Sequence, residues 1–94
     1  MNKTQPMRLS ADWMSIADDR ILEFLHDAGP TTPTRMCENG RVRFSRQHIN
    51  MRCKKLSAYG LLDELGNGVY AISEAGERYL GGDLDAADLE SAVE

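Results

Sequence analysis

The chain has 94 residues, of which 41% are hydrophobic and 28% charged, and its formal net charge is −4. This length and balance fit one soluble domain with a modest core and exclude a second domain. The apolar stretches are too short to cross a bilayer and the first residues lack a secretory signal, so we expect a cytoplasmic protein without a membrane partner. Two cysteines without repeated spacing argue against a disulfide framework.

The N-terminal third predicts an arm followed by an amphipathic helix. Residues 1–9 carry little pattern and are expected to form a flexible arm or an added strand, within an N-terminal arm of residues 1–11. Apolar residues then recur every three or four positions from about Asp12 to Ala28, where Gly29-Pro30 ends the helix. The side opposite the apolar stripe is expected to carry the acids Asp18, Asp19, Glu23 and Asp27.

The middle of the chain predicts two more helices. Thr32 followed by Pro33 is typical of a helix start, so a short second helix is expected over 33–38, closed by Asn39-Gly40. Residues 41–44 alternate polar and apolar and predict a brief extended segment. Ser45 then caps a third helix that reaches about Tyr59. Its buried stripe is expected to be Ile49, Cys53 and Leu56.

The last third predicts a hairpin, a helix and a tail. Two strand-like runs, 61–65 and 69–72, are separated by Gly66-Asn67-Gly68, which favours a β-hairpin. Ser73 opens a fourth helix that runs to Leu80 before Gly81-Gly82 ends it. Residues 83–94 form an acidic C-terminal tail, and the apolar Leu84, Ala87, Leu89 and Val93 within it favour a frayed helix. The predicted domain is therefore 12–82.

Helix, helix, helix, hairpin, helix is the order of a winged helix-turn-helix, a mainly α fold with a small β-hairpin. The charge distribution agrees with a DNA-binding version of it. Seven of the 11 basic residues lie between Arg35 and Lys55, with Glu38 as the only acid among them. Such a local excess inside an acidic protein predicts an interaction surface for a negatively charged partner, and double-stranded DNA fits best.

In a winged helix the third helix enters the major groove. Opposite the apolar stripe, the outward arc of helix 45–59 holds Gln47, Asn50, Met51 and Lys54, flanked by Arg46, His48 and Lys55, with Ser45 at its start. Asn and Gln can pair with adenine, Arg and Lys with guanine, and Met can touch a thymine methyl group. The alternative is that this polar face is only a solvated face.

Two further contacts with DNA are predicted outside the third helix. Arg41 and Arg43 lie two positions apart on the expected extended segment and would point together at phosphates. The alternative is that they are edge charges that discourage strand pairing. The hairpin tip carries no basic residue, so it would contact DNA through backbone amides or Asn67; a purely structural turn is the alternative.

The sequence gives no sign of catalysis or of a bound cofactor. Cys37, Cys53, His26 and His48 match no zinc-ligand spacing, so we expect no metal, and Cys53 is expected to be a small buried hydrophobe. There is no phosphate-binding glycine loop and no nucleophile motif. We therefore expect neither an enzyme nor a small-molecule ligand.

Several blocks of this sequence resemble a known family. They are Trp13-Met14, residues 18–23, Ser45-Arg46-Gln47-His48-Ile49, Cys53-Lys54-Lys55-Leu56, Gly60-Leu61-Leu62 and Gly66-Asn67-Gly68-Val69-Tyr70. Together, over roughly residues 12–82, they resemble the phi-H-repressor-like winged helix-turn-helix regulators of halophilic archaea and their viruses. The resemblance implies a sequence-specific transcriptional repressor that binds an inverted repeat as a homodimer, in a cytoplasm rich in potassium chloride.

Other functions remain open at this point. Winged helices also serve as protein-protein interaction modules, in which the basic face would meet an acidic partner without specific DNA binding. Non-specific binding of chromatin or RNA is a weaker alternative, because it favours a positive chain with exposed aromatic residues, and only 6% of this chain is aromatic.

Overall fold

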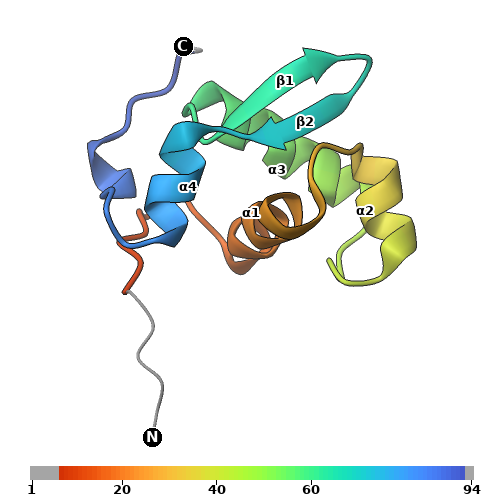
Figure 1. Ribbon diagram of the computed structural model, residues 1–94, viewed down its shortest axis with the longest axis horizontal. Coiled ribbons are helices and arrows are strands. Elements are labelled where there is room, and N and C mark those ends of the chain that lie inside the picture. The colour runs from red at the N-terminus through yellow and green to blue at the C-terminus, as the bar shows by residue number, and fades with distance from the viewer. Residues whose placement is uncertain (1–6, 93–94) are drawn as a thin grey trace, which may run out of the picture.

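The computed structural model describes residues 7–92 and has the predicted order of elements (Figure 1). These are α1 (Ile16–Ala28), α2 (Pro33–Asn39), α3 (Arg46–Ala58), β1 (Leu62–Gly66), β2 (Val69–Ile72), α4 (Glu74–Leu80) and a short 3-10 helix η1 (Ala86–Asp88). The winged helix-turn-helix prediction is confirmed. In the described residues, no helix is long and apolar enough to cross a membrane.

Side-chain caps start these helices where the sequence supplies them. The hydroxyl groups of Thr32, Ser45 and Ser73 accept hydrogen bonds from the backbone three residues on, at 3.1–3.2 Å. α1 starts at Ile16 rather than near Asp12, because Ser15 is its cap and the Ser15 amide donates to the Asp18 carboxylate at 3.0 Å. α2 ends at Asn39 and is capped by Gly40, which takes the left-handed conformation with φ 85°.

A single core joins the helices to the hairpin. α1 lies in the middle of the molecule, with α4 on one side and α2 on the other, and α3 crosses behind it from the α2 side to the start of the hairpin (Figure 1). The predicted stripe of α3 is confirmed, because its three residues are fully buried against α1, α2 and the hairpin. The core consists of Ile21, Leu22, Phe24, Leu25, Met36, Val42, Ile49, Cys53, Leu56, Leu61, Leu62, Tyr70, Tyr79 and Ala86.

The hairpin turns at Asn67 and Gly68, whose φ values are 58° and 77°. Positive φ at both central residues is the geometry that an Asn-Gly pair favours in two-residue turns. Leu62 pairs with Ile72 and Gly66 with Val69, and the register shifts between Glu64 and Gly66. The tip therefore stands out from the body as a wing with Asn67 at its end.

The expected extended segment at residues 41–44 is wrong. The chain bends there, since Val42 turns into the core at 1% exposure and the Phe44 amide donates to the Val42 carbonyl at 3.0 Å. The extended residue that joins the hairpin is Thr31, before α2. Its amide and carbonyl exchange hydrogen bonds of 3.0 and 2.8 Å with Tyr70.

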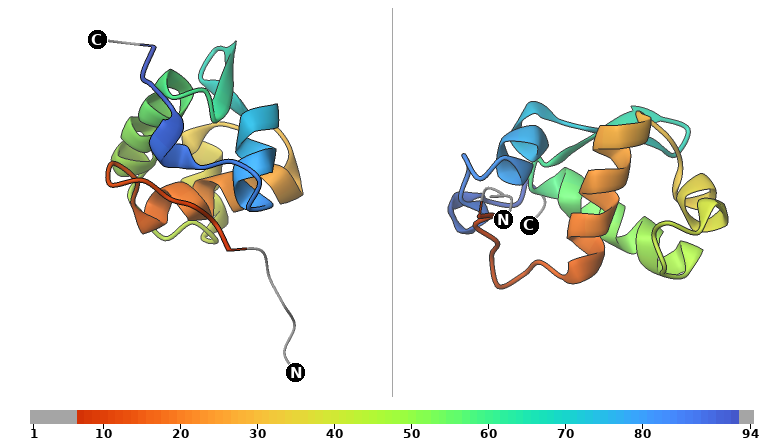
Figure 2. Two further views of the ribbon diagram at one scale, coloured as in Figure 1. Left: turned by 90° about the vertical axis from the view of Figure 1, so that its left-hand side faces the viewer. Right: turned by 60° about the horizontal axis from the view of Figure 1, so that its bottom comes forward.

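Residues flanking the predicted domain pack onto it. Leu9 pairs with Asp85 in parallel, and the Ala86 amide donates to the Leu9 carbonyl at 2.8 Å. Figure 2 shows residues 7–11 running beside the segment that follows α4. The expected frayed tail helix is instead one short 3-10 turn, because Ala86 is fully buried and holds the tail against the core. Val93, which was expected to continue that helix, lies outside the described residues.

Candidate nucleic-acid interface

The helix α3 presents three different faces besides its buried stripe, which follow from its 3.6 residues per turn. One flank carries His48, Arg52 and Tyr59. The opposite flank carries Arg46 and Asn50. The outward face carries Gln47, Met51 and Lys54. Each of these faces has different neighbours in the structure.

The flank of His48, Arg52 and Tyr59 is occupied by contacts within the protein. The His48 ring stacks on Phe44 with 5.2 Å between ring centroids, and the Tyr59 ring stacks on Trp13 at 3.9 Å. Arg52 forms two hydrogen bonds with the Asp18 carboxylate, at 2.8 and 2.6 Å, and a third with the Trp13 carbonyl at 2.9 Å. This flank therefore anchors α3 to the start of α1.

Asp18 is the main departure from the predicted polar side of the first helix. It is 0% exposed and lies on the inner side of α1, whereas the sequence analysis placed it among the outer acids. The hydrogen bonds from Arg52 and the Ser15 amide satisfy the buried carboxylate. Ile21 and Leu22 lie three and four residues after Asp18, and this helical spacing indicates that Asp18 shares their apolar stripe.

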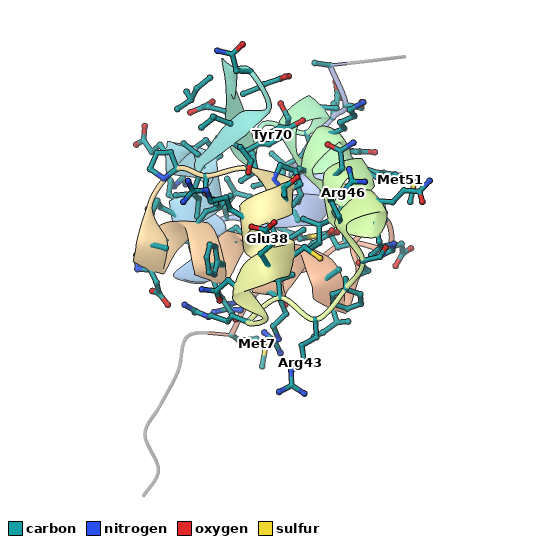
Figure 3. The ribbon with its side chains drawn as sticks, turned by 90° about the vertical axis from the view of Figure 1, so that its right-hand side faces the viewer. Met7, Glu38, Arg43, Arg46, Met51 and Tyr70 are labelled. Carbon is teal, nitrogen blue, oxygen red and sulfur yellow. The ribbon has the colours of Figure 1, made fainter. Side chains whose placement is uncertain are left out.

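The outward face of α3 is free of such contacts. Gln47, Met51 and Lys54 are exposed, Met51 at 58%, and none has an ion pair or side-chain hydrogen bond within the described residues. Figure 3 shows Met51 projecting from the outer side of α3. Lys55 is also exposed, on the border with the anchored flank. These residues can therefore meet a partner without breaking any contact.

The flank of Arg46 and Asn50 faces a cleft of about 290 Å³. Figure 3 shows Arg46 between α3 and α2, on the side of the wing. The cleft is lined by Thr32, Pro33, Thr34, Arg46, Asn50, Asn67 and Gly68. Three elements far apart in the sequence thus meet there, namely the start of α2, α3 and the wing tip.

The two arginines before α3 separate. The Arg41 guanidinium turns back to α1, where it pairs with Asp27 at 2.5 Å and lies 5.6 Å from the centroid of the Phe24 ring. Arg43 is exposed and projects at the edge of the molecule away from the wing (Figure 3). The bend at Val42 breaks the alternation that would have aimed both side chains in one direction.

Comparisons with known proteins agree on one family. A family model described as winged helix-turn-helix phage repressor matches residues 7–92. The chain belongs to this family. A repressor protein of Halobacterium phage phiH is 36% identical over 92 residues, which cover 92% of this chain and 100% of the relative. The crystal structure of a PhiH1 repressor-like protein from Haloarcula marismortui superposes with a TM-score of 0.87 at 42% identity, covering 93% of this chain and 99% of that one.

The family match confirms the resemblance inferred from the sequence and extends it. It includes residues 7–11 and 83–92, which the sequence analysis left outside the resemblance. Residues 83–92 pack on the body of this phage-repressor domain through the buried Ala86, and residues 7–11 contact it through Arg8 and pair with the tail through Leu9. Because residues 7–11 and 83–92 contact each other, it is consistent that the family model includes both segments.

The basic segment of this family member is divided by the fold. Arg41 and Arg52 are bound to acids of α1, so they contribute little net charge to the surface. The other five have no ion pair within residues 7–92, and they are Arg35, Arg43, Arg46, Lys54 and Lys55. The positive charge available to a partner is therefore concentrated on α2, the bend and α3.

Two features of this surface differ from what the sequence predicts. Thr34, an exposed hydroxyl on α2, lies in the cleft with Arg46 and Asn50, but no local pattern connects it to α3. Arg52 was counted in the basic segment but serves inside the protein. Arg52 lies one turn after His48, on the flank beside the apolar stripe, and this position indicates that its side chain can reach the interior.

Proposed function

We propose that this chain is a DNA-binding transcriptional repressor whose helix α3 reads bases in the major groove. The observation that carries the proposal is the outward face of α3, with Gln47, Met51 and Lys54 exposed and without partners in residues 7–92 of a phage-repressor domain. These side chains suit base edges, because an amide can pair with adenine, an ammonium with guanine and a thioether with a thymine methyl group. Membership in a repressor family favours a regulator over an enzyme.

The remaining predicted contacts would position the protein on the DNA backbone. Arg43 and Lys55 are exposed and close in sequence to the two ends of α3, where phosphates flank the groove. Ser45 and His48 lie at the helix start, where the His48 amide is already bound to the Ser45 hydroxyl. Arg41 would have to leave Asp27 to reach a phosphate, so we expect it to contribute least.

We further propose a homodimer that binds an inverted repeat in the cytoplasm of a halophilic archaeon. A C2-symmetric protein matches an inverted repeat, with one α3 in each half-site about one helical turn from the other. Relatives from a Halobacterium phage and from Haloarcula marismortui support the habitat. In about 1 M salt the screening length is only about 3 Å, so groove contacts would carry a larger share of the affinity than they do at low salt.

The proposal is tested by selecting binding sites from random duplex DNA with the purified chain, at about 0.2 M and about 2 M potassium chloride, a range over which phosphate contacts fade. We expect an enriched inverted repeat that survives the higher salt. Gln47→Ala should lose base preference at one position of each half-site, whereas Glu74→Ala, an exposed residue on α4, should not.

Two outcomes would contradict the proposal. A folded chain that enriches no sequence at either salt would favour a protein-protein interaction module. Equal loss of all DNA binding in both variants would show that the outward face of α3 has no special part. The dimer is checked separately by light scattering with and without the selected site.

A further inference from the structure

We propose that the cleft between α3 and the wing tip holds a phosphate group of one DNA strand. Its binding groups are the side chains of Thr34, Arg46, Asn50 and Asn67. The inference rests on the proposed function and divides the predicted contact residues in a new way. Asn50 binds the backbone and does not read a base, and Thr34 joins the interface.

The side chains that line the cleft offer hydrogen-bond donors and a positive charge, which suits an anion that only accepts hydrogen bonds. Five polar side chains that can donate line it, one of them a guanidinium, and no carboxylate lines it. The Thr32 hydroxyl is engaged as the cap of α2, where it accepts from the Arg35 amide at 3.2 Å. The other four donors have no ion pair or side-chain hydrogen bond in the described part of the chain, so a phosphate would meet them unoccupied.

Another cleft on this molecule shows the contrast. It lies between α1 and α4 and is lined by Arg8, Glu23, His26, Asp27, Arg41, Glu77, Leu80 and Gly81. Every basic side chain in it already contacts an acid: Arg8 contacts Glu23, Arg41 contacts Asp27, and His26 contacts Glu77, at 2.5–2.6 Å. That cleft is satisfied internally, whereas the cleft beside α3 has its one positive charge unpaired.

The helical geometry separates this cleft from the base-reading face. Arg46 and Asn50 are one turn apart on the flank that faces Asn67, whereas Gln47 and Met51 are one turn apart on the outward face. When the outward face enters a major groove, a sugar-phosphate strand borders that groove on each side. The strand on the wing side would pass between α3 and Asn67, where the four side chains converge.

The experiment combines protein variants with DNA in which single phosphates are replaced, one at a time, by uncharged methylphosphonate linkages across the selected site. We expect replacement of one particular phosphate in each half-site to lower the affinity of the wild-type protein for the DNA about tenfold, because a charge-assisted contact is lost. The Arg46→Gln variant should bind normal DNA about tenfold more weakly than wild type. Replacing that same phosphate should then lower its affinity little further, because the arginine charge that contacts the phosphate is already absent.

The controls distinguish this site from a general loss of positive charge. Lys54→Gln removes one charge from the outward face and should remain sensitive to that linkage. Thr34→Val keeps the side-chain shape, and Asn67→Gly keeps the positive φ of the turn. Each of these two variants, and also Asn50→Ala, should weaken binding to the selected site and to random DNA by the same factor. None of them should change which sequence is selected.

The outcomes also separate this inference from the function on which it rests. If folded wild-type protein binds no duplex, the proposed function itself fails. If it binds a selected site but Arg46→Gln remains as sensitive as wild type to every replaced phosphate, only the cleft proposal is overturned. A change of base preference in Asn50→Ala would likewise overturn it and return Asn50 to base reading.

Discussion

Arg52 shows how one side chain can look like part of a binding surface and serve the interior instead. Its side chain is 15% exposed, and its guanidinium joins Asp18 on α1 to the Trp13 carbonyl before that helix. The Asp18 carboxylate also caps α1 through the Ser15 amide. One ion pair therefore sets both the start of α1 and the orientation of α3 on it, so it positions the outward face without touching a partner.

Removing Arg52 leaves the buried Asp18 carboxylate without a positive partner. We expect Arg52→Met to lower the free energy of unfolding by about 3 kcal/mol. Urea denaturation at neutral pH, followed by circular dichroism, measures the loss. Lys55→Met, also on α3 but exposed, should cost less than about 0.5 kcal/mol. Equal stability of the two variants would show that the pair contributes nothing beyond a surface charge.

The two cysteines differ in reactivity because they differ in burial. Burial, together with the nearby Asp18 carboxylate, raises the pKa of the Cys53 thiol to about 12, whereas Cys37 is half-buried on α2. Only a thiolate reacts, and a raised pKa leaves almost none near pH 8. We expect a maleimide reagent to label Cys37 of the native protein and Cys53 only after unfolding. Mass spectrometry of the labelled peptides identifies the cysteine that has reacted. Faster labelling of Cys53 than of Cys37 in the native protein would contradict the buried position of Cys53.

At the scale of elements, α4 docks on the hairpin through the absence of a side chain. Gly76 is buried in α4, and a Cβ atom there would overlap the Leu61 carbonyl oxygen and lie 2.6 Å from Cγ1 of Ile72. Helix propensity alone favours alanine over glycine by about 1 kcal/mol. Close approach to the backbone reverses that preference, because the Leu61 carbonyl also accepts the hydrogen bond from the Ser73 amide that opens α4.

We therefore expect Gly76→Ala to destabilise the fold by about 1 to 3 kcal/mol, the usual cost of overpacking. Gly81→Ala is the matched control, since a Cβ there would make only ordinary contacts, the nearest at 3.6 Å. Its effect on the midpoint of thermal unfolding should be near zero or slightly favourable. A Gly76→Ala variant as stable as wild type would contradict the close packing of α4 on Leu61.

At the scale of the whole molecule, residues near the two ends close the fold together. Arg8 pairs with Glu23 of α1 at 2.5 Å and donates to the Leu80 carbonyl at the end of α4 at 3.4 Å. Leu84 and Leu89 pack against the core on either side of the buried Ala86. The division into an arm of 1–11, a domain of 12–82 and a tail of 83–94 remains a prediction, and removing the residues that make these contacts would test it.

A chain of residues 12–82 would lose the Leu9 pairing and the apolar contacts of the tail. We expect its free energy of unfolding to fall by about 2 to 4 kcal/mol, since burial of one leucine contributes about 1.5 to 3 kcal/mol. Chemical denaturation of both chains gives the difference. Ala86→Asp in the full chain places a charge at a fully buried position and should have a loss of similar size. A shortened chain as stable as the full one would support the predicted division.

The sequence alone determined α2, α3, the hairpin and α4, because their signals are local, whereas the start of α1, the bend at residues 41–44 and the 3-10 turn of the tail differ from the prediction. Ser45 and Tyr59 bound α3, as predicted, and Asn67-Gly68 forms the turn of the wing. A cap needs only a hydroxyl near the next turn, and a hairpin turn only two residues that accept positive φ. The apolar stripe of α3 and the family resemblance were likewise available from spacing and motif.

Only the tertiary structure decided which polar groups remain available to a partner. Asp18 and Arg52 are 34 residues apart, and Arg41 meets Asp27 across 14 residues, so no local pattern pairs them. The cleft of Thr34, Arg46, Asn50 and Asn67 exists because three separate elements dock on one core. Such contacts depend on the angles at which elements pack, and those angles are set by complementary side chains from the whole chain rather than by periodicity within one segment.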